Sequence, residues 1–109
     1  MHIADLRMLV EKECKRLAQL GSTKAIADEF GSRGIQGRIN DKDDCPLARG
    51  ICDTLLMANG AVSVFATHVA VYVPDDDEFE TLVVFSNGMR VLTNFVIEFD
   101  FRWFPNLIQ

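Results

Sequence analysis

The sequence predicts one α+β domain, in which three helices come first, a three-stranded antiparallel meander follows, and a fourth helix comes last. Two changes of hydrophobic period indicate this order. Apolar residues recur every three to four positions up to about residue 58, alternate between residues 61 and 85, and then return to helical spacing. Consecutive strands with short connections favour an antiparallel meander with helices on one face. No repeat or linker divides the 109 residues, so we expect residues 1–109 to form a single domain.

Three amphipathic segments are expected to form the N-terminal helices. They lie at residues 3–20, 22–30 and 44–58. Gly21 should close the first helix in the left-handed conformation, and Ser22 should cap the second helix. Asp43 or Asp44 should cap the third helix, where Pro46 is tolerated because the first helical turn needs no backbone N–H.

Three β-rich runs and a last helix follow. The strands are expected at residues 61–66, 68–73 and 82–85. The four consecutive acids of residues 75–78 are expected to be a solvated turn. Ser86 or Asn87 should cap the last helix, and Pro105 prevents it from extending further. The expected common core consists of Leu47, Ile51, Leu55, Val62, Val64, Val71, Leu92, Phe95 and Val96.

Charge is unevenly distributed along the chain. Residues 1–54 hold nine basic and nine acidic side chains, whereas residues 55–109 hold two basic and seven acidic ones and carry the whole net charge of −5. An acidic half repels nucleic acid and anionic membranes. Residues 25–31 resemble the first helix of a helix-turn-helix, but residues 44–58 supply too few basic side chains to read DNA bases. No apolar run approaches the ~20 residues that cross a bilayer. We therefore expect neither DNA nor a membrane as partner.

The cysteines and histidines bear on location and on metal binding. Cys14, Cys45 and Cys52 lack the spacing of a disulfide framework, and charges near the N-terminus argue against a signal peptide. Both observations predict a cytoplasmic protein. Cys45 and Cys52 would lie about 10.5 Å apart along a helix, too far to share a zinc ion. His2 and His68 add no local spacing, so we expect no metal and no cofactor.

Cys45 and His68 are the candidate catalytic residues. A thiol at a helix start has a lowered pKa, and a histidine follows at the start of a strand. The strings DCPL at residues 44–47 and HVAVYV at residues 68–73 faintly resemble NlpC-type cysteine peptidases. Only 23 residues separate the two side chains, and Pro46 stands where the family usually has Ser. A buried thiol and a strand-edge histidine are the structural alternative.

The glycine-punctuated segment RGIQGRI, residues 33–39, is a candidate nucleic-acid site. It resembles the GxxG loop with which KH domains clamp an RNA backbone, and Arg33 and Arg38 flank Gly34 and Gly37. The expected strand before the first KH helix is missing, and the net charge is acidic. The alternative is a tight connection with solvated arginines, so RNA binding is not expected at physiological salt.

The C-terminal segment is unusually rich in aromatic residues. Half of the ten aromatics lie in the last fifteen residues. One small domain cannot bury apolar groups that point in every direction, so this segment either wraps over its own core or meets a partner. The candidate interface residues are Phe101, Trp103, Phe104 and Leu107.

Four motifs together resemble small uncharacterised proteins of actinobacteria and their phages. They are GIQG at residues 34–37, CPLAR at residues 45–49, VSV at residues 62–64 and FD-x3-FP-x-L at residues 99–107. Phe104 stands where this family commonly has Tyr, and the resemblance covers most of residues 25–108. The family has no assigned activity, so the resemblance implies no catalytic residues. It implies an accessory or phage-encoded protein.

These observations lead to three functional hypotheses. The first is a small intracellular protein-interaction module that binds another protein or associates with itself. The second is a thiol hydrolase that uses Cys45 and His68. The third is an RNA-binding domain that uses the loop of residues 33–38.

Overall fold

Four α-helices and one three-stranded antiparallel sheet make up the computed structural model, which describes residues 2–109. This arrangement confirms the predicted α+β class and the order of elements. The elements are α1 (Ile3–Ala18), α2 (Thr23–Ser32), α3 (Pro46–Thr54), β1 (Ser63–Val64), β2 (His68–Val73), β3 (Glu78–Val84), the 3-10 turn η1 (Asn87–Met89), α4 (Arg90–Asp100) and the 3-10 turn η2 (Pro105–Leu107).

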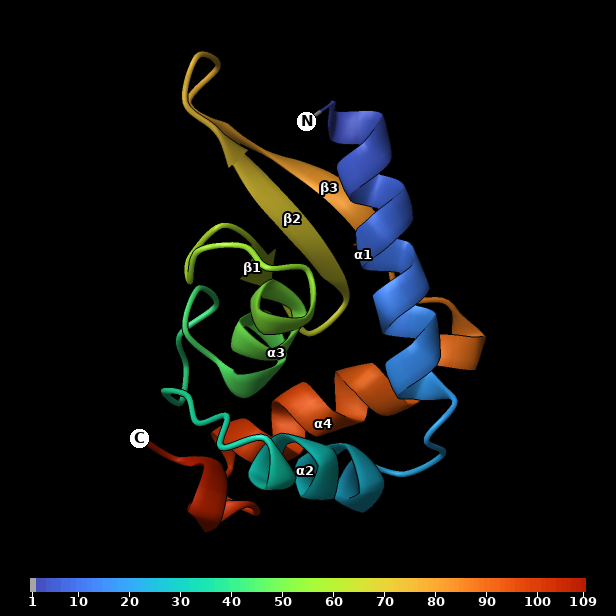
Figure 1. Ribbon diagram of the computed structural model, residues 1–109, viewed down its shortest axis with the longest axis vertical. Helices are drawn as coiled ribbons and strands as arrows, with labels where there is room; N and C mark the ends of the chain where they lie inside the picture. The colour runs from blue at the N-terminus through green and yellow to red at the C-terminus, as the bar shows by residue number, and fades with distance from the viewer. Residues whose placement is uncertain (1) are drawn as a thin grey trace.

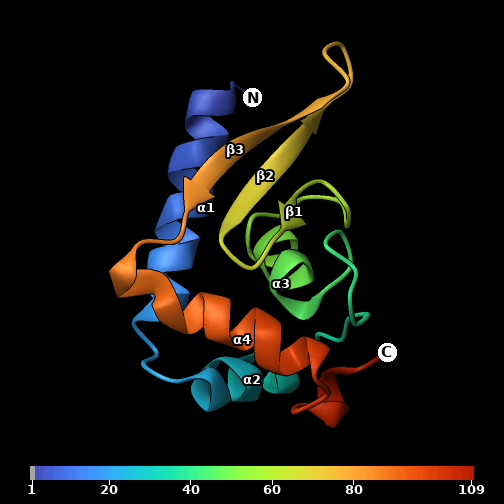
Figure 2. The same ribbon diagram turned by 180° about the vertical axis from the view of Figure 1, so that it is seen from behind.

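The sheet has helices on one face only. Its strand order is β1-β2-β3, and both pairs are antiparallel. Figure 1 shows α1 and α3 in front of the sheet, with α2 and α4 crossing below it. Figure 2 shows the opposite face, where none of the described helices crosses β2 or β3. The sheet is therefore the outer layer of the molecule on that side.

The ends of the first two helices follow the predicted chemistry. Gly21 has a φ of +88°, the left-handed conformation in which glycine has no steric penalty. The hydroxyl of Ser22 accepts a hydrogen bond of 3.0 Å from the N–H of Ala25 at the start of α2. Both predictions are confirmed.

The third helix is shorter than predicted at both ends. Its N-cap is Cys45 rather than Asp43 or Asp44, and the Cys45 sulfur accepts the N–H of Ala48 at 3.4 Å. The N–H groups of both aspartates instead donate to the carboxylate of Asp41, which folds this segment into a turn. The helix ends at Thr54, and Leu56 shortly after it has a left-handed backbone with a φ of +56°.

The strands also differ in length from the prediction. β1 has two residues rather than six, and β3 begins at Glu78 rather than at Leu82. Glu78 pairs with Val73, so the solvated turn is confined to residues 74–77. The last helix is preceded by η1, and the Ser86 side chain makes no capping hydrogen bond there.

Most of the predicted core is buried, with two exceptions. Leu55 and Val71 are only partly buried. Leu55 lies just beyond the end of α3, and Val71 lies in the part of β2 that does not pair with β1. The other seven predicted positions have relative exposures of 8% or less. The core also includes Phe30, whose ring meets that of Phe95 edge-on at 5.6 Å. In the described part of the chain, no helix combines the length and apolarity that a membrane span requires.

Candidate functional site

The C-terminal segment after α4 is held in a fixed turn. Arg102 is left-handed, with a φ of +67°, and its N–H donates to the carbonyl of Phe99 at 2.8 Å. The N–H of Trp103 donates to the carbonyl of Glu98 at 3.0 Å. These bonds end the helix and turn the chain back towards α2, where η2 packs. The side chains of this segment therefore have defined directions.

The four predicted interface residues divide into two pairs. Leu107 is fully buried, and Phe104 stacks on the core residue Phe95 with ring centroids 5.5 Å apart. This pair completes the domain's own core. Phe101 and Trp103 are 73% and 67% exposed, and we call them the C-terminal aromatic pair. The segment thus wraps over the core and also presents two large aromatic side chains to solvent.

The glycine loop is built into the fold through its backbone. The N–H of Gly37 donates to Leu107 O, and its carbonyl accepts from the N–H of Gln109, both at 2.8 Å. A Cβ on Gly37 would lie 2.5 Å from the carbonyl oxygen of Asp44, so only glycine fits there. Gly34 has a φ of +69° and open space around it. The backbone groups of Gly37 are therefore already occupied and cannot clamp a phosphate.

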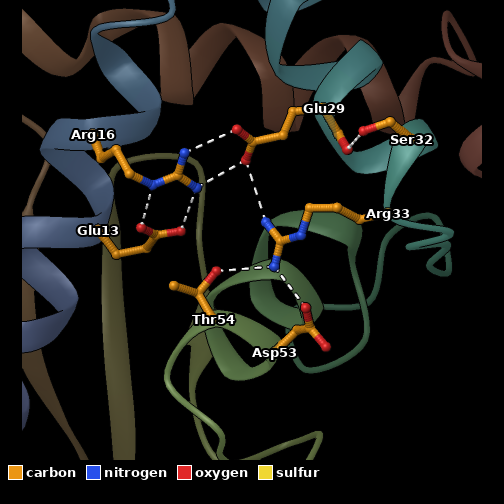
Figure 3. A network of polar contacts seen from close by, with 7 residues as sticks. All are labelled: Glu13, Arg16, Glu29, Ser32, Arg33, Asp53 and Thr54. Carbon is orange, nitrogen blue, oxygen red and sulfur yellow. Dashed lines mark hydrogen bonds and ion pairs between the residues drawn. The ribbon is translucent and has the colours of Figure 1, made fainter.

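Arg33 belongs to an ion-pair network that joins three helices (Figure 3). Its guanidinium donates to the carboxylates of Glu29 at 3.2 Å and Asp53 at 2.6 Å. Arg16 donates to Glu29 as well, and also to the buried carboxylate of Glu13. Two arginines bridge three carboxylates, so the network links α1, α2 and α3 and keeps one net negative charge. Arg33 is thus engaged inside the fold.

Arg38 is the other arginine that flanks the glycine loop. Its side chain is exposed, and its N–H donates to the carbonyl of Asp44 at 2.8 Å. The structure therefore brings only one of the two predicted phosphate-binding arginines to a free surface.

The two residues of the predicted catalytic pair lie in different surroundings. Cys45 is 4% exposed, and burial raises the pKa of its thiol to about 12. Nearby Asp100 and Asp41 raise the pKa further, and all three line a pocket of about 270 Å³. His68 does not line this pocket; its ring stacks on Phe65 at 4.5 Å. The thiol is therefore protonated at neutral pH.

The outer face of the sheet carries a group of aromatic side chains that the sequence did not reveal as a group. The ring of Phe65 lies 4.5 Å from that of His68 and 6.1 Å from that of Phe79, and Phe79 lies 5.4 Å from Tyr72. We call these four residues the aromatic ladder. Residues of β2 at even numbers share this face, and Phe79 pairs directly with Tyr72. The strand predicted for residues 82–85 was too short to include Phe79, so the pairing of Phe79 with Tyr72 was missed.

Comparisons of the chain with protein-family models, with curated proteins and with solved structures found no match.

Proposed function

We propose that this protein is a small cytoplasmic protein-interaction module, and that the C-terminal aromatic pair anchors its interface. The observation that carries the proposal is the exposure of Phe101 and Trp103 beside a fully packed core. Exposed aromatic side chains are costly in water, and aromatic residues are enriched at the centres of protein interfaces. Arg102 between them adds the cation that often accompanies such anchors.

The backbone of the C-terminal segment supports this role. Phe104 and Leu107 are packed into the core, so the turn that carries the aromatic pair is fixed before any partner binds. A rigid anchor loses little conformational entropy on association, which leaves more of the contact energy for affinity. Ile97, which is 42% exposed, lies one helical turn before Phe101 and extends the apolar surface along α4.

Self-association is the form of binding that we propose first. In a two-fold dimer the same patch faces itself, so an apolar stripe on one helix can pair with its own copy. Ile97 of α4 and Phe101, the C-cap residue four positions later, form such a stripe. A second protein with a complementary apolar groove is the other form. An accessory or phage-encoded origin, which the motif resemblance implies, stays a prediction.

Sedimentation velocity on a double variant, Phe101→Ala with Trp103→Ala, tests the proposal. Aromatic anchors often contribute more than about 2 kcal/mol, so association should weaken roughly thirtyfold and the apparent mass should fall. The melting temperature should change little, because both side chains are exposed. Phe104→Ala is the matched control, since it should lower the melting temperature instead. A double variant with unchanged mass and unchanged partner capture would contradict the proposal.

The two alternatives receive less support from the geometry. A thiol hydrolase needs a thiolate, and the pKa of Cys45 is raised to about 12. An RNA clamp needs free backbone N–H groups and free arginines, whereas Gly37 and Arg33 are both bonded within the fold.

A further inference from the structure

We propose that the outer face of the sheet is a second binding surface, and that its ligand is a basic peptide segment of a partner protein. Lysine or arginine side chains of that segment stack on the aromatic ladder, and the acids of residues 75–78 meet the remaining positive charge. The outer face of the sheet is a different surface from the one that carries the C-terminal aromatic pair.

The aromatic ladder is accessible from solvent. Tyr72 and Phe79 are each 46% exposed, and Val84 beyond them is 66% exposed. On the opposite face the paired residues Val69 and Val83 are 0% and 6% exposed and belong to the hydrophobic core. Figure 2 shows the open face with both long strands uncovered. The four rings are contiguous on an open sheet face, with Phe79 at 87° to Phe65 and at 55° to Tyr72, so a ligand would meet both ring faces and ring edges.

One cation of the chain itself already lies over a ring of the aromatic ladder. The ammonium group of Lys42 lies 5.5 Å from the centroid of the Phe79 ring, within the range of a cation–π interaction. Ring faces carry negative potential, so they attract ammonium and guanidinium groups and give no such attraction to carboxylates or phosphates. Only one ring of the four receives a cation from the described chain. Phe65 and His68 cover one face of each other by stacking, so the half-exposed ring of Tyr72 is the one most open to a cation of a partner.

Charge at the end of the ladder favours the same ligand. The acidic side chains of residues 75–78 are all exposed, and within residues 2–109 none of them takes part in an ion pair. Asp77 accepts a hydrogen bond from the Tyr72 hydroxyl, which places a carboxylate directly at the end of the ladder. Opposite charges steer association and fix its orientation. An extended basic segment complements both the rings and the acids.

The same charges argue against the two other occupants of an aromatic sheet face. RNA bases stack on exposed aromatic rings in many sheets, but four unpaired acids beside the ladder repel the phosphates that supply most of the affinity. A second copy of this chain would bring another net charge of −5 to the same face. Both become outcomes of the test.

The test is a fluorescence-anisotropy titration of the full chain with three labelled probes. These are an eight-residue peptide with alternating Arg and Ser, the matching peptide with Glu in place of Arg, and an eight-nucleotide single-stranded RNA. We expect saturable binding of the arginine peptide alone. Phe79→Leu keeps an apolar side chain but removes the ring, so it should weaken binding about 2- to 30-fold, and Tyr72→Leu should act similarly.

Two controls make the result decisive. Asp75→Asn with Asp76→Asn keeps the ladder and should weaken binding and reduce its salt dependence, whereas Trp103→Ala should leave the affinity unchanged. Thermal melts of each variant verify that the fold is retained. The proposal is overturned if the arginine peptide does not bind, or if RNA binds more tightly. It is also overturned if the ring variants bind as well as the unaltered chain, because charge alone would then explain the affinity.

Discussion

Arg16 of α1 and Glu29 of α2 are joined by two hydrogen bonds of 2.8 Å each, the bidentate geometry in which guanidinium and carboxylate fit best. The same arginine makes two further bonds to Glu13, one turn away. Two helices that are separated by a single tight turn are thereby fixed against each other. The hydrogen bond from Arg16 is the main reason that the pKa of Glu29 lies below its usual value of 4.5.

This pair predicts how stability depends on pH. A carboxylate whose pKa is lowered in the folded state stabilises the fold above pH 4.5, and that contribution disappears as the pH falls through the folded pKa. Glu29→Gln should therefore lower the free energy of unfolding by about 1 kcal/mol at pH 7 and by less at pH 3, measured in urea melts. Asp28→Asn, at an exposed neighbouring position, is the control and should show little difference at either pH. An equal loss from Glu29→Gln at both values would refute the assignment.

Truncation of Ile51 and truncation of Leu55, four positions later, should destabilise the fold to different extents. Ile51 is fully buried, so Ile51→Ala should cost about 2–5 kcal/mol. Leu55 lies beyond the end of α3 and is only partly buried, so Leu55→Ala should cost roughly 1–2 kcal/mol. Denaturant melts of both variants give the comparison. A larger loss at Leu55 would mean that α3 continues past Thr54.

Alanine substitution should destabilise the fold more at Gly37 than at Gly34 in the glycine loop. Gly37→Ala would place a Cβ against backbone atoms on the opposite side of the loop, so we expect a loss of about 3 kcal/mol or more, or failure to fold. Gly34→Ala meets only the left-handed backbone penalty, about 1–2 kcal/mol. Circular dichroism melts distinguish the two. Equal effects would show that the close packing at Gly37 is not a constraint.

The three cysteines should react slowly with thiol reagents in the folded protein. Cys14, Cys45 and Cys52 are all buried, and burial raises the pKa of the first two to about 12 and raises that of Cys52 as well. Because the thiolate is the reactive form, labelling with iodoacetamide at pH 8 should be much slower than in urea, where all three thiols should react. Rapid labelling of Cys45 in the folded protein, located by peptide mass spectrometry, would restore the thiol hydrolase as a candidate.

Sequence patterns predicted the helices better than the strands, for identifiable reasons. Gly21 and Ser22 have strong local preferences, and their roles were confirmed. The start of β3 was missed because Glu78 and Glu80 have low strand propensity and follow three aspartates. Pairing with β2 overrides that preference. The cap of α3 was misassigned because Cys45 is not a typical capping residue, whereas the aspartates beside it are.

Candidate sites were harder to predict because they depend on contacts between distant segments. The sequence identified the C-terminal aromatics as a group, but the division between buried Leu107 and exposed Trp103 follows from where η2 packs. The aromatic ladder combines a loop residue, Phe65, with residues of two strands. Its register is set by the pairing of Tyr72 with Phe79, which no local pattern specifies.

The bridge between Gly37 and Ile108 has a consequence for biosynthesis. Its two residues lie about 70 positions apart, and Leu107 beside the bridge is part of the core. The chain leaves the ribosome from its N-terminus, so the loop around Gly37 emerges about 70 residues before the segment that it pairs with. Helices α1 and α2 can form early, but the fold cannot close until residues 107–109 have emerged. Nascent chains arrested before Leu107 should therefore remain open to proteases and available to chaperones.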